Sequence, residues 1–205
     1  MKTDDQSPYK MSFAVGGLFI NESVEVAKLR DPSERWAETI SRAIQSGIIS
    51  SPKIASRRRT LREIANRLCT LCPPEIELLS VTPDRNEQQA LLWLATCRAY
   101  RFVEEFACEV IRDRYLSYRL ELPLESFDVF FDAKAEWHEE LTKISSSTRK
   151  KLRQVLFRIM RDAGIITVEN RIQKALLSAR LRSLIAQNKP REIELFPGLE
   201  QEASA

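Results

Sequence analysis

The chain has 205 residues, of which 43% are hydrophobic, 30% are charged and only five are glycine. This length supports one large domain or two small ones with real cores. No stretch approaches 18 consecutive apolar residues and the first twenty residues lack a secretory signal, so we expect neither a membrane span nor export, and the cytoplasm is the expected compartment.

The net charge of +3 conceals an uneven distribution of charge along the chain. Residues 143–161 contain seven cations and no acid, and residues 53–67 contain six cations and one acid. Residues 121–140 contain seven acids and one lysine. We therefore expect two basic blocks and one acidic block.

Residues 13–72 are expected to form an N-terminal domain of three helices in the helix-turn-helix style. Its first helix should be capped by Asn21. Its last helix, Ser56 to Leu71, has an apolar stripe opposite a basic arc. The polar segment before this domain, residues 1–12, is expected to be a flexible tail.

Residues 73–190 are expected to form a C-terminal helical domain. The segment from Asn86 to Tyr118 is the most apolar of the chain, so it should supply two core helices with a bend near Cys97 to Tyr100. The alternation in residues 192–196 predicts a short edge strand, and residues 197–205 should be a second flexible tail.

Residues 145–187 have the element order of a winged helix-turn-helix. A strong helix from about Thr148 to Asp162 is expected to be capped by the run Ser145 to Thr148 and to end at Ala163-Gly164. A β-type run and a turn come next, which predicts a small β-hairpin wing near 165–173. The predicted fold class is therefore mainly α, with two helix-turn-helix-like parts.

The basic helix that starts near Thr148 has the features of a nucleic-acid reader. Hydroxyls at Ser147 and Thr148 precede Arg149 and Lys150 at a helix N-terminus, where backbone N–H groups favour an anion. Two alternatives remain open, namely pairing of this face with the acidic block or with a partner protein, and plain solvation. The absence of acids before Asp162 favours nucleic acid over a solvated face.

The triple arginine Arg57-Arg58-Arg59 lies at the start of a helix, where the dipole disfavours cations. A phosphate backbone would offset that cost, as would acids elsewhere in the chain.

Catalytic and metal chemistry find little support in the sequence. Cys69 and Cys72 form a CxxC, but no second ligand pair at matching spacing accompanies it, so we expect buried free thiols. The acids at Asp128 and Asp132 lack the loop of a calcium site, and His138 has no nucleophile partner at a recognisable spacing. We predict no enzyme activity, metal, cofactor or small-molecule substrate.

Four parts of the chain are familiar as a set, namely Gly16 to Ala27, Leu91 to Ala95 with Tyr100-Arg-Phe102, Phe130 to His138, and Ser147 to Phe157 with Ala163-Gly164. Together they resemble the BrxA family, small proteins of BREX bacteriophage-exclusion systems. The resemblance runs from about residue 13 to 187.

This resemblance implies a bacterial cytosolic defence component that is mainly helical, related in fold to NusB-type RNA-binding proteins and helix-turn-helix proteins, and able to bind double-stranded DNA. It implies no catalytic residue, and it transfers no binding motif residue by residue.

We accordingly predict a non-enzymatic protein that binds double-stranded DNA and other BREX proteins. Charge and position, rather than the family, select the contacts. The predicted DNA contacts are Arg57, Arg58, Arg59, Arg62, Ser147, Thr148, Arg149, Lys150, Lys151, Arg153, Arg158 and Arg171. The alternatives are a protein–protein scaffold of the defence complex and an RNA-binding protein of NusB-like type.

Overall fold

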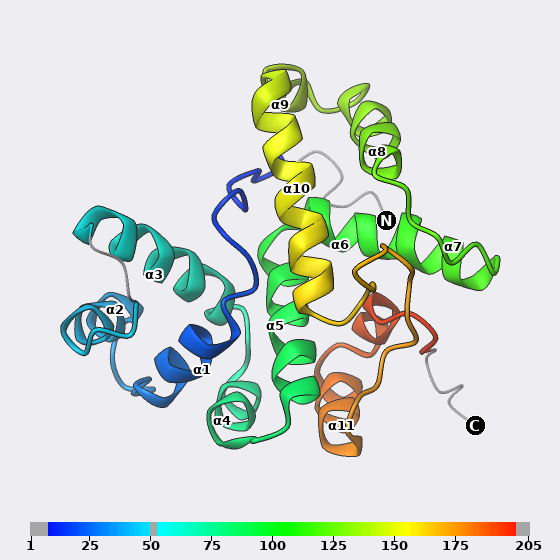
Figure 1. The fold of residues 1–205 in the computed structure, drawn as a ribbon. Coiled ribbons are helices and arrows are strands. Elements are labelled where there is room, and N and C mark those ends of the chain that lie inside the picture. Colours follow the sequence, from blue (N-terminus) through cyan, green and yellow to red (C-terminus); the bar gives the residue numbers. More distant parts are fainter. Residues whose placement is uncertain (1–7, 50–52, 200–205) are drawn as a thin grey trace.

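The computed structural model describes residues 8–49 and 53–199. Within these ranges the chain is helical in the main and contains no β-strand, which confirms the predicted mainly α class. Figure 1 shows the first four helices on one side of a central pair, with the acidic and basic helices of the second half beside that pair.

The N-terminal helices are α1 (Ile20–Lys28), α2 (Trp36–Gln45), α3 (Ile54–Leu68) and α4 (Pro73–Val81). The prediction that Asn21 caps the first helix was wrong. Helix α1 starts two residues earlier than an Asn21 cap implies, after Phe19 in the left-handed conformation (φ 55°), and no side chain caps it.

The central core is formed by α5 (Arg85–Ala99) and α6 (Arg101–Phe106). The chain bends between them at Tyr100, which leaves the helical region with φ −136°, so the predicted bend is confirmed. Helix α6 continues through a π-helical stretch, η1 (Ala107–Arg112), into α7 (Asp113–Leu116).

The acidic and basic blocks fold into α8 (Glu125–Ala135), α9 (Glu139–Thr142) and α10 (Ser146–Asp162). Ser145 caps α10 as expected, because its Oγ accepts a hydrogen bond from the N–H of Thr148 at 3.3 Å.

The chain ends in α11 (Ala179–Asn188) and a 3₁₀ helix, η2 (Pro190–Leu195). The edge strand predicted for residues 192–196 was therefore wrong. Pro190 begins a helical turn, and the apparent alternation arises because Ile193 and Leu195 are buried in the core while Glu192 is buried in an ion pair.

The predicted hairpin near 165–173 is present as a minimal one. Ile166 and Ile172 form an isolated antiparallel bridge, and the Thr167 N–H donates to Arg171 O at 2.8 Å. Asn170 takes the positive φ of 62° that the tight turn requires. Residues 120–122 lie along its other edge, where the N–H of Leu122 donates to Asn170 O at 2.9 Å.

The buried side chains of both halves form one continuous core from Tyr9 to Leu199. The described parts of the two predicted tails belong to it, since Tyr9 and Leu199 are only 5% and 8% exposed. The rest of both tails lies outside the described residues. The domain boundary at residue 72 stays a prediction, and α1 packs on α4 and α3 packs on α5 across it.

Candidate nucleic-acid interface

Helix α10 presents three different polar sides around its apolar stripe. At 100° per residue, Arg149 and Arg153 project from one flank and Ser147, Lys151 and Arg158 from the other. Lys150, Gln154 and Arg161 project opposite the stripe. The core-facing stripe consists of Leu152, Val155, Leu156, Phe157, Ile159 and Met160, all buried.

The first flank of α10 faces the acidic helix α8. Arg149 donates to Asp128 at 2.9 Å and to both carboxylate oxygens of Asp132 at 2.5 and 2.9 Å, and its guanidinium lies 4.5 Å from the ring centre of Phe131. Arg153 also pairs with Asp128. These two arginines, predicted as DNA contacts, are thus balanced within the chain. On this flank of α10 the arginines therefore pair with the acidic block, which is the alternative to nucleic-acid binding that the sequence left open.

The hydrogen bond from Arg149 lowers the pKa of the Asp132 carboxyl below its usual range, although the side chain is largely exposed. The Asp132 carboxyl is therefore charged at neutral pH, so a phosphate would have to displace this carboxylate to reach Arg149.

The second flank and the start of α10 present the hydroxyls and cations that the sequence predicted there. The hydroxyl of Ser145 hydrogen-bonds to those of Ser147 at 3.1 Å and Thr148 at 2.9 Å, and no acid lies in the first turn. Lys150 and Lys151 are exposed, and neither has an ion-pair partner in the described part of the chain. This end of α10 therefore combines free N–H groups, hydroxyls and two unbalanced lysines.

Helix α3 exposes fewer cations than the sequence count implies. Arg58, Arg59 and Arg62 are exposed and without an ion-pair partner in the described ranges. Arg57 is half-buried, and its Nε has no hydrogen-bond partner among the described residues. Arg67, at 2% exposure, pairs with the buried Glu63 at 2.7 Å.

A cleft of about 660 Å³ brings the two basic blocks together. Helix α3 contributes Ser56, Arg59 and Thr60 to its lining, at the i, i+3, i+4 spacing of one helix face. The lining from α10 is Ser147, Thr148 and Lys151. Residues more than eighty positions apart in the sequence thus share one surface, between the helices that Figure 1 shows on either side of the N-terminal segment.

The N-terminal segment forms the floor of this cleft through Ala14, Val15, Gly16 and Phe19. Gly16 has φ +66°, and a Cβ there would lie 2.0 Å from the Phe19 ring. The Leu18 N–H donates to Asp162 at 3.0 Å, which fastens the segment to the end of α10. Sequence reasoning missed this floor, although the glycine pair offered a signal for a close approach.

The remaining predicted contacts lie toward the other end of α10. Arg158 is 66% exposed and lies 3.9 Å from Asp162. Arg171 is exposed on the hairpin, to which α10 is tied by hydrogen bonds from Arg161 to Asn170 at 3.0 and 3.2 Å. Neither Arg158 nor Arg171 lines the cleft.

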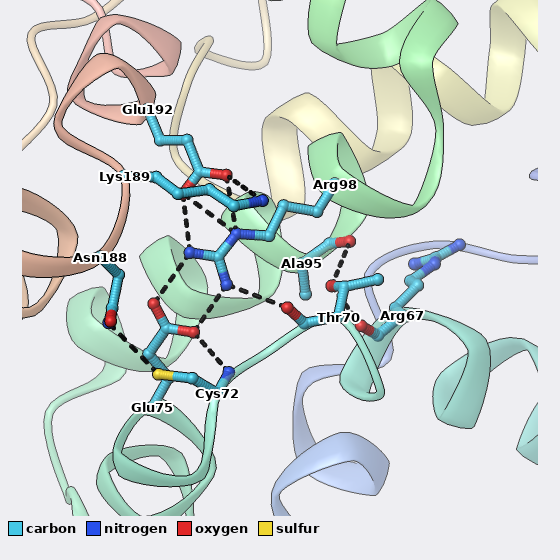
Figure 2. Close-up of polar contacts among 9 residues, drawn as sticks. All are labelled: Arg67, Thr70, Cys72, Glu75, Ala95, Arg98, Asn188, Lys189 and Glu192. Carbon is cyan, nitrogen blue, oxygen red and sulfur yellow. Dashed lines mark hydrogen bonds and ion pairs between the residues drawn. The ribbon is translucent and has the colours of Figure 1, made fainter.

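A buried charge cluster, also missed from the sequence, holds α4, α5 and η2 together. Figure 2 shows the guanidinium of Arg98 between the carboxylates of Glu75 and Glu192, to which it donates at 2.6 to 3.1 Å. Burial alone would raise the pKa of Glu75. The hydrogen bonds from Arg98 and from the N–H of Cys72 bring it below its usual range. The cluster is enclosed, so its role is structural.

The cysteines are free thiols. Burial raises the pKa of Cys72 and, further, that of Cys97, which lowers their reactivity. The expectation of buried thiols is confirmed for Cys97 but was wrong for Cys69, which is exposed, and Cys72 and Cys108 are only partly buried. Over residues 8–49 and 53–199, no group of three His, Cys, Asp or Glu side chains is placed to hold a metal ion. In the same ranges no helix has the length and apolar character needed to span a membrane.

Comparison with known proteins shows the family. Residues 7–189 match the BrxA family model. The chain belongs to the BrxA family. The BREX protein BrxA of Escherichia coli O9:H4 (strain HS) is 28% identical over 159 residues, which are 76% of this chain and 73% of that protein. The BREX protein BrxA of Paramagnetospirillum magneticum (strain AMB-1) is 25% identical over 189 residues, 88% of this chain and 91% of that one.

A solved structure shares the fold of this chain. The crystal structure of an uncharacterized protein from Magnetospirillum magneticum has a TM-score of 0.77 and covers 93% of this chain and 98% of its own, at 20% identity. At this identity the likeness shows the shared fold alone. The resemblance stated from the sequence is therefore confirmed as to family, and the helical architecture is common to both proteins.

Proposed function

We propose that this BrxA family protein is a non-enzymatic component of a BREX phage-defence system and that it binds the backbone of double-stranded DNA along the cleft between α3 and α10. The observation that carries the proposal is the cleft itself. It joins Arg59 of one basic block to Lys151 of the other, and the α10 N-terminus opens beside them.

The chemistry of the cleft suits a phosphodiester backbone. Lysine and arginine replace condensed counterions, while hydroxyls and helix N–H groups donate to phosphate oxygens and fix register. Arg58 and Arg62 lie one turn apart on the adjoining side of α3, which extends the cationic surface beyond the cleft. Such contacts give binding with little dependence on base sequence.

We include the hairpin after α10 in the proposed DNA-binding surface, because the element order is that of a winged helix. The hairpin follows α10 directly and exposes Arg171 and Val168, the latter at 81%. In a winged helix the element after the recognition helix contacts the flanking backbone. Arg149 and Arg153 then serve mainly to orient α10 against α8, and Lys150 and Lys151 make the direct contacts.

A mobility-shift titration with a 20-base-pair duplex tests the proposal. We expect Lys151→Glu to weaken binding about tenfold at low salt, and Arg59→Glu with Lys151→Glu to weaken it further, because each reversal removes one phosphate contact and adds repulsion. Arg35→Glu reverses one charge on α2, where the side chain is 86% exposed and outside the cleft, and should change affinity less than about twofold.

Two results would contradict the assignment. If the wild-type protein fails to shift duplex DNA at low salt, or if the double reversal binds as the wild type does, the cleft is not a DNA site. Single-stranded RNA that competes more strongly than the duplex would instead favour the NusB-like alternative. A double reversal that loses BREX partners but keeps DNA would favour the scaffold alternative.

A further inference from the structure

The segment from Arg171 to Arg191 is a third basic region. It contains six cations and no acid, namely Arg171, Lys174, Arg180, Arg182, Lys189 and Arg191. Lys174, Arg180 and Arg191 are exposed, and no ion pair to another described residue neutralises them. Figure 1 shows α11 and α3 on opposite sides of α5, so this region and the cleft face different surroundings.

A hollow of about 210 Å³ adjoins this basic region. Ala90, Ile165, Ala175 and Phe196 give it an apolar floor, and Lys174 is on its rim. Leu176 also lines it and is 72% exposed, an unusual position for a large apolar side chain on a loop. The amides of Asn86, Gln89 and Gln173 complete the lining.

Chain connectivity keeps the cations close to this hollow. Leu176 and Leu177 line it, and Arg180 follows only three residues later, within about 10 Å along the chain. A partner whose apolar side chain entered the hollow would therefore meet Lys174 and Arg180 at its edge.

The start of α11 is closed to a phosphate, unlike the start of α10. Ser178 caps α11 and its hydroxyl donates to the buried carboxylate of Glu87. That carboxylate occupies the place where an anion would meet the helix N-terminus. The exposed leucine, the hollow with its apolar floor and amide rim, and the flanking cations favour an acidic protein segment over nucleic acid.

We propose that the surface formed by Lys174, Leu176, Arg180 and the adjoining hollow binds an acidic protein segment with an apolar anchor residue. The anchor occupies the hollow beside Leu176, and carboxylates on either side of it pair with Lys174 and Arg180. This surface is separate from the cleft between α3 and α10 and works independently of whether that cleft binds DNA.

Selection of peptides on the intact protein tests this surface without knowledge of the partner. A random dodecapeptide library is selected on the wild-type chain, and the enriched peptides are labelled and measured by fluorescence anisotropy. We expect Asp and Glu to flank a leucine or an aromatic residue in the enriched sequences. Lys174→Glu with Arg180→Glu should weaken the best peptide about tenfold, and Leu176→Asp should weaken it as well.

The controls distinguish binding at this surface from binding at the DNA cleft and from purely electrostatic binding. Lys151→Glu should bind the peptide as the wild type does, and the Lys174→Glu, Arg180→Glu variant should keep its far-ultraviolet circular dichroism and its duplex affinity. A serine in place of the anchor should abolish peptide binding. Enriched peptides without acids, equal binding by the double variant, or a parallel loss of duplex binding would each overturn the proposal.

Discussion

The guanidinium of Arg149 donates to the carboxylate of Asp128 at 2.9 Å, and this contact joins the basic helix α10 to the acidic helix α8. Asp128 is shared, because Arg153 pairs with its other oxygen. The two charged blocks of the sequence are therefore partly complementary to each other. Lys151, on the flank that faces α3, and Lys150, opposite the apolar stripe, remain without an ion-pair partner in the described part of the chain.

We expect Asp128→Asn to lower the free energy of unfolding by about 1–2 kcal/mol, because two arginines lose a charged acceptor in a partly buried place. Urea denaturation followed by circular dichroism measures the change. Lys150→Ala, on the exposed side of the same helix, should change the free energy by less than about 0.5 kcal/mol. Equal stability of Asp128→Asn and wild type would show that the contact contributes nothing.

The cluster around Arg98 should be more sensitive. Arg98→Met leaves Glu75, which is fully buried, without its cation, and we expect a loss of about 3–5 kcal/mol in the free energy of unfolding. The double variant Arg98→Met with Glu75→Leu also removes the Glu75 charge and should recover part of that loss, since Glu192 keeps Lys189 at 3.5 Å. If the double variant is no more stable than Arg98→Met, the cost does not come from the uncompensated Glu75 carboxylate.

The same cluster gives stability a defined dependence on pH. The folded pKa of Glu75 lies below its unfolded value of about 4.3, so its contribution is present above that pH and is lost as the pH falls through the folded pKa. We expect Glu75→Gln, measured by urea unfolding from pH 6 downward, to show a shallower acid decline than the wild type. Parallel declines would assign the acid sensitivity to other carboxylates.

The sequence predicted the positions of the helices better than the contacts that their charged side chains make in the fold. Periodicity identified the helix at α10 and its Ser145 cap, because apolar spacing and capping are local properties. It could not show that Arg149 turns toward Asp132, or that Arg67 is buried, because a charge count treats every cation as exposed. The cleft joins residues 59 and 151, and no local pattern connects positions so far apart.

The salt dependence of duplex binding should report the number of cleft contacts. Removing one phosphate contact reduces the slope of log affinity against log salt by about 0.9. We therefore expect Lys151→Ala and Arg59→Ala each to flatten the slope by about that amount, and the double variant to flatten it by about twice as much. Arg35→Ala should leave the slope unchanged. Slopes that stay constant across all four proteins would place the phosphate contacts elsewhere.

The floor of the cleft can be tested through its glycines. Gly16 and Gly47 both have positive φ, at 66° and 73°, but of these two only Gly16 faces a neighbour among the described residues, since a Cβ there would overlap the Phe19 ring. Gly47→Ala should therefore cost only the backbone strain, about 1 kcal/mol, whereas Gly16→Ala should cost about 1–3 kcal/mol more.

Comparison of the two variants isolates the contact with Phe19, because the backbone penalty is common to both. Thermal unfolding gives the stabilities, and duplex binding by folded Gly16→Ala should also weaken, since the displaced Phe19 ring lies in the floor between Arg59 and Lys151. Equal losses of stability at Gly16 and Gly47 would show that the floor accommodates a methyl group. In that case, the shape of the cleft would not depend on the close packing of Gly16 against the Phe19 ring.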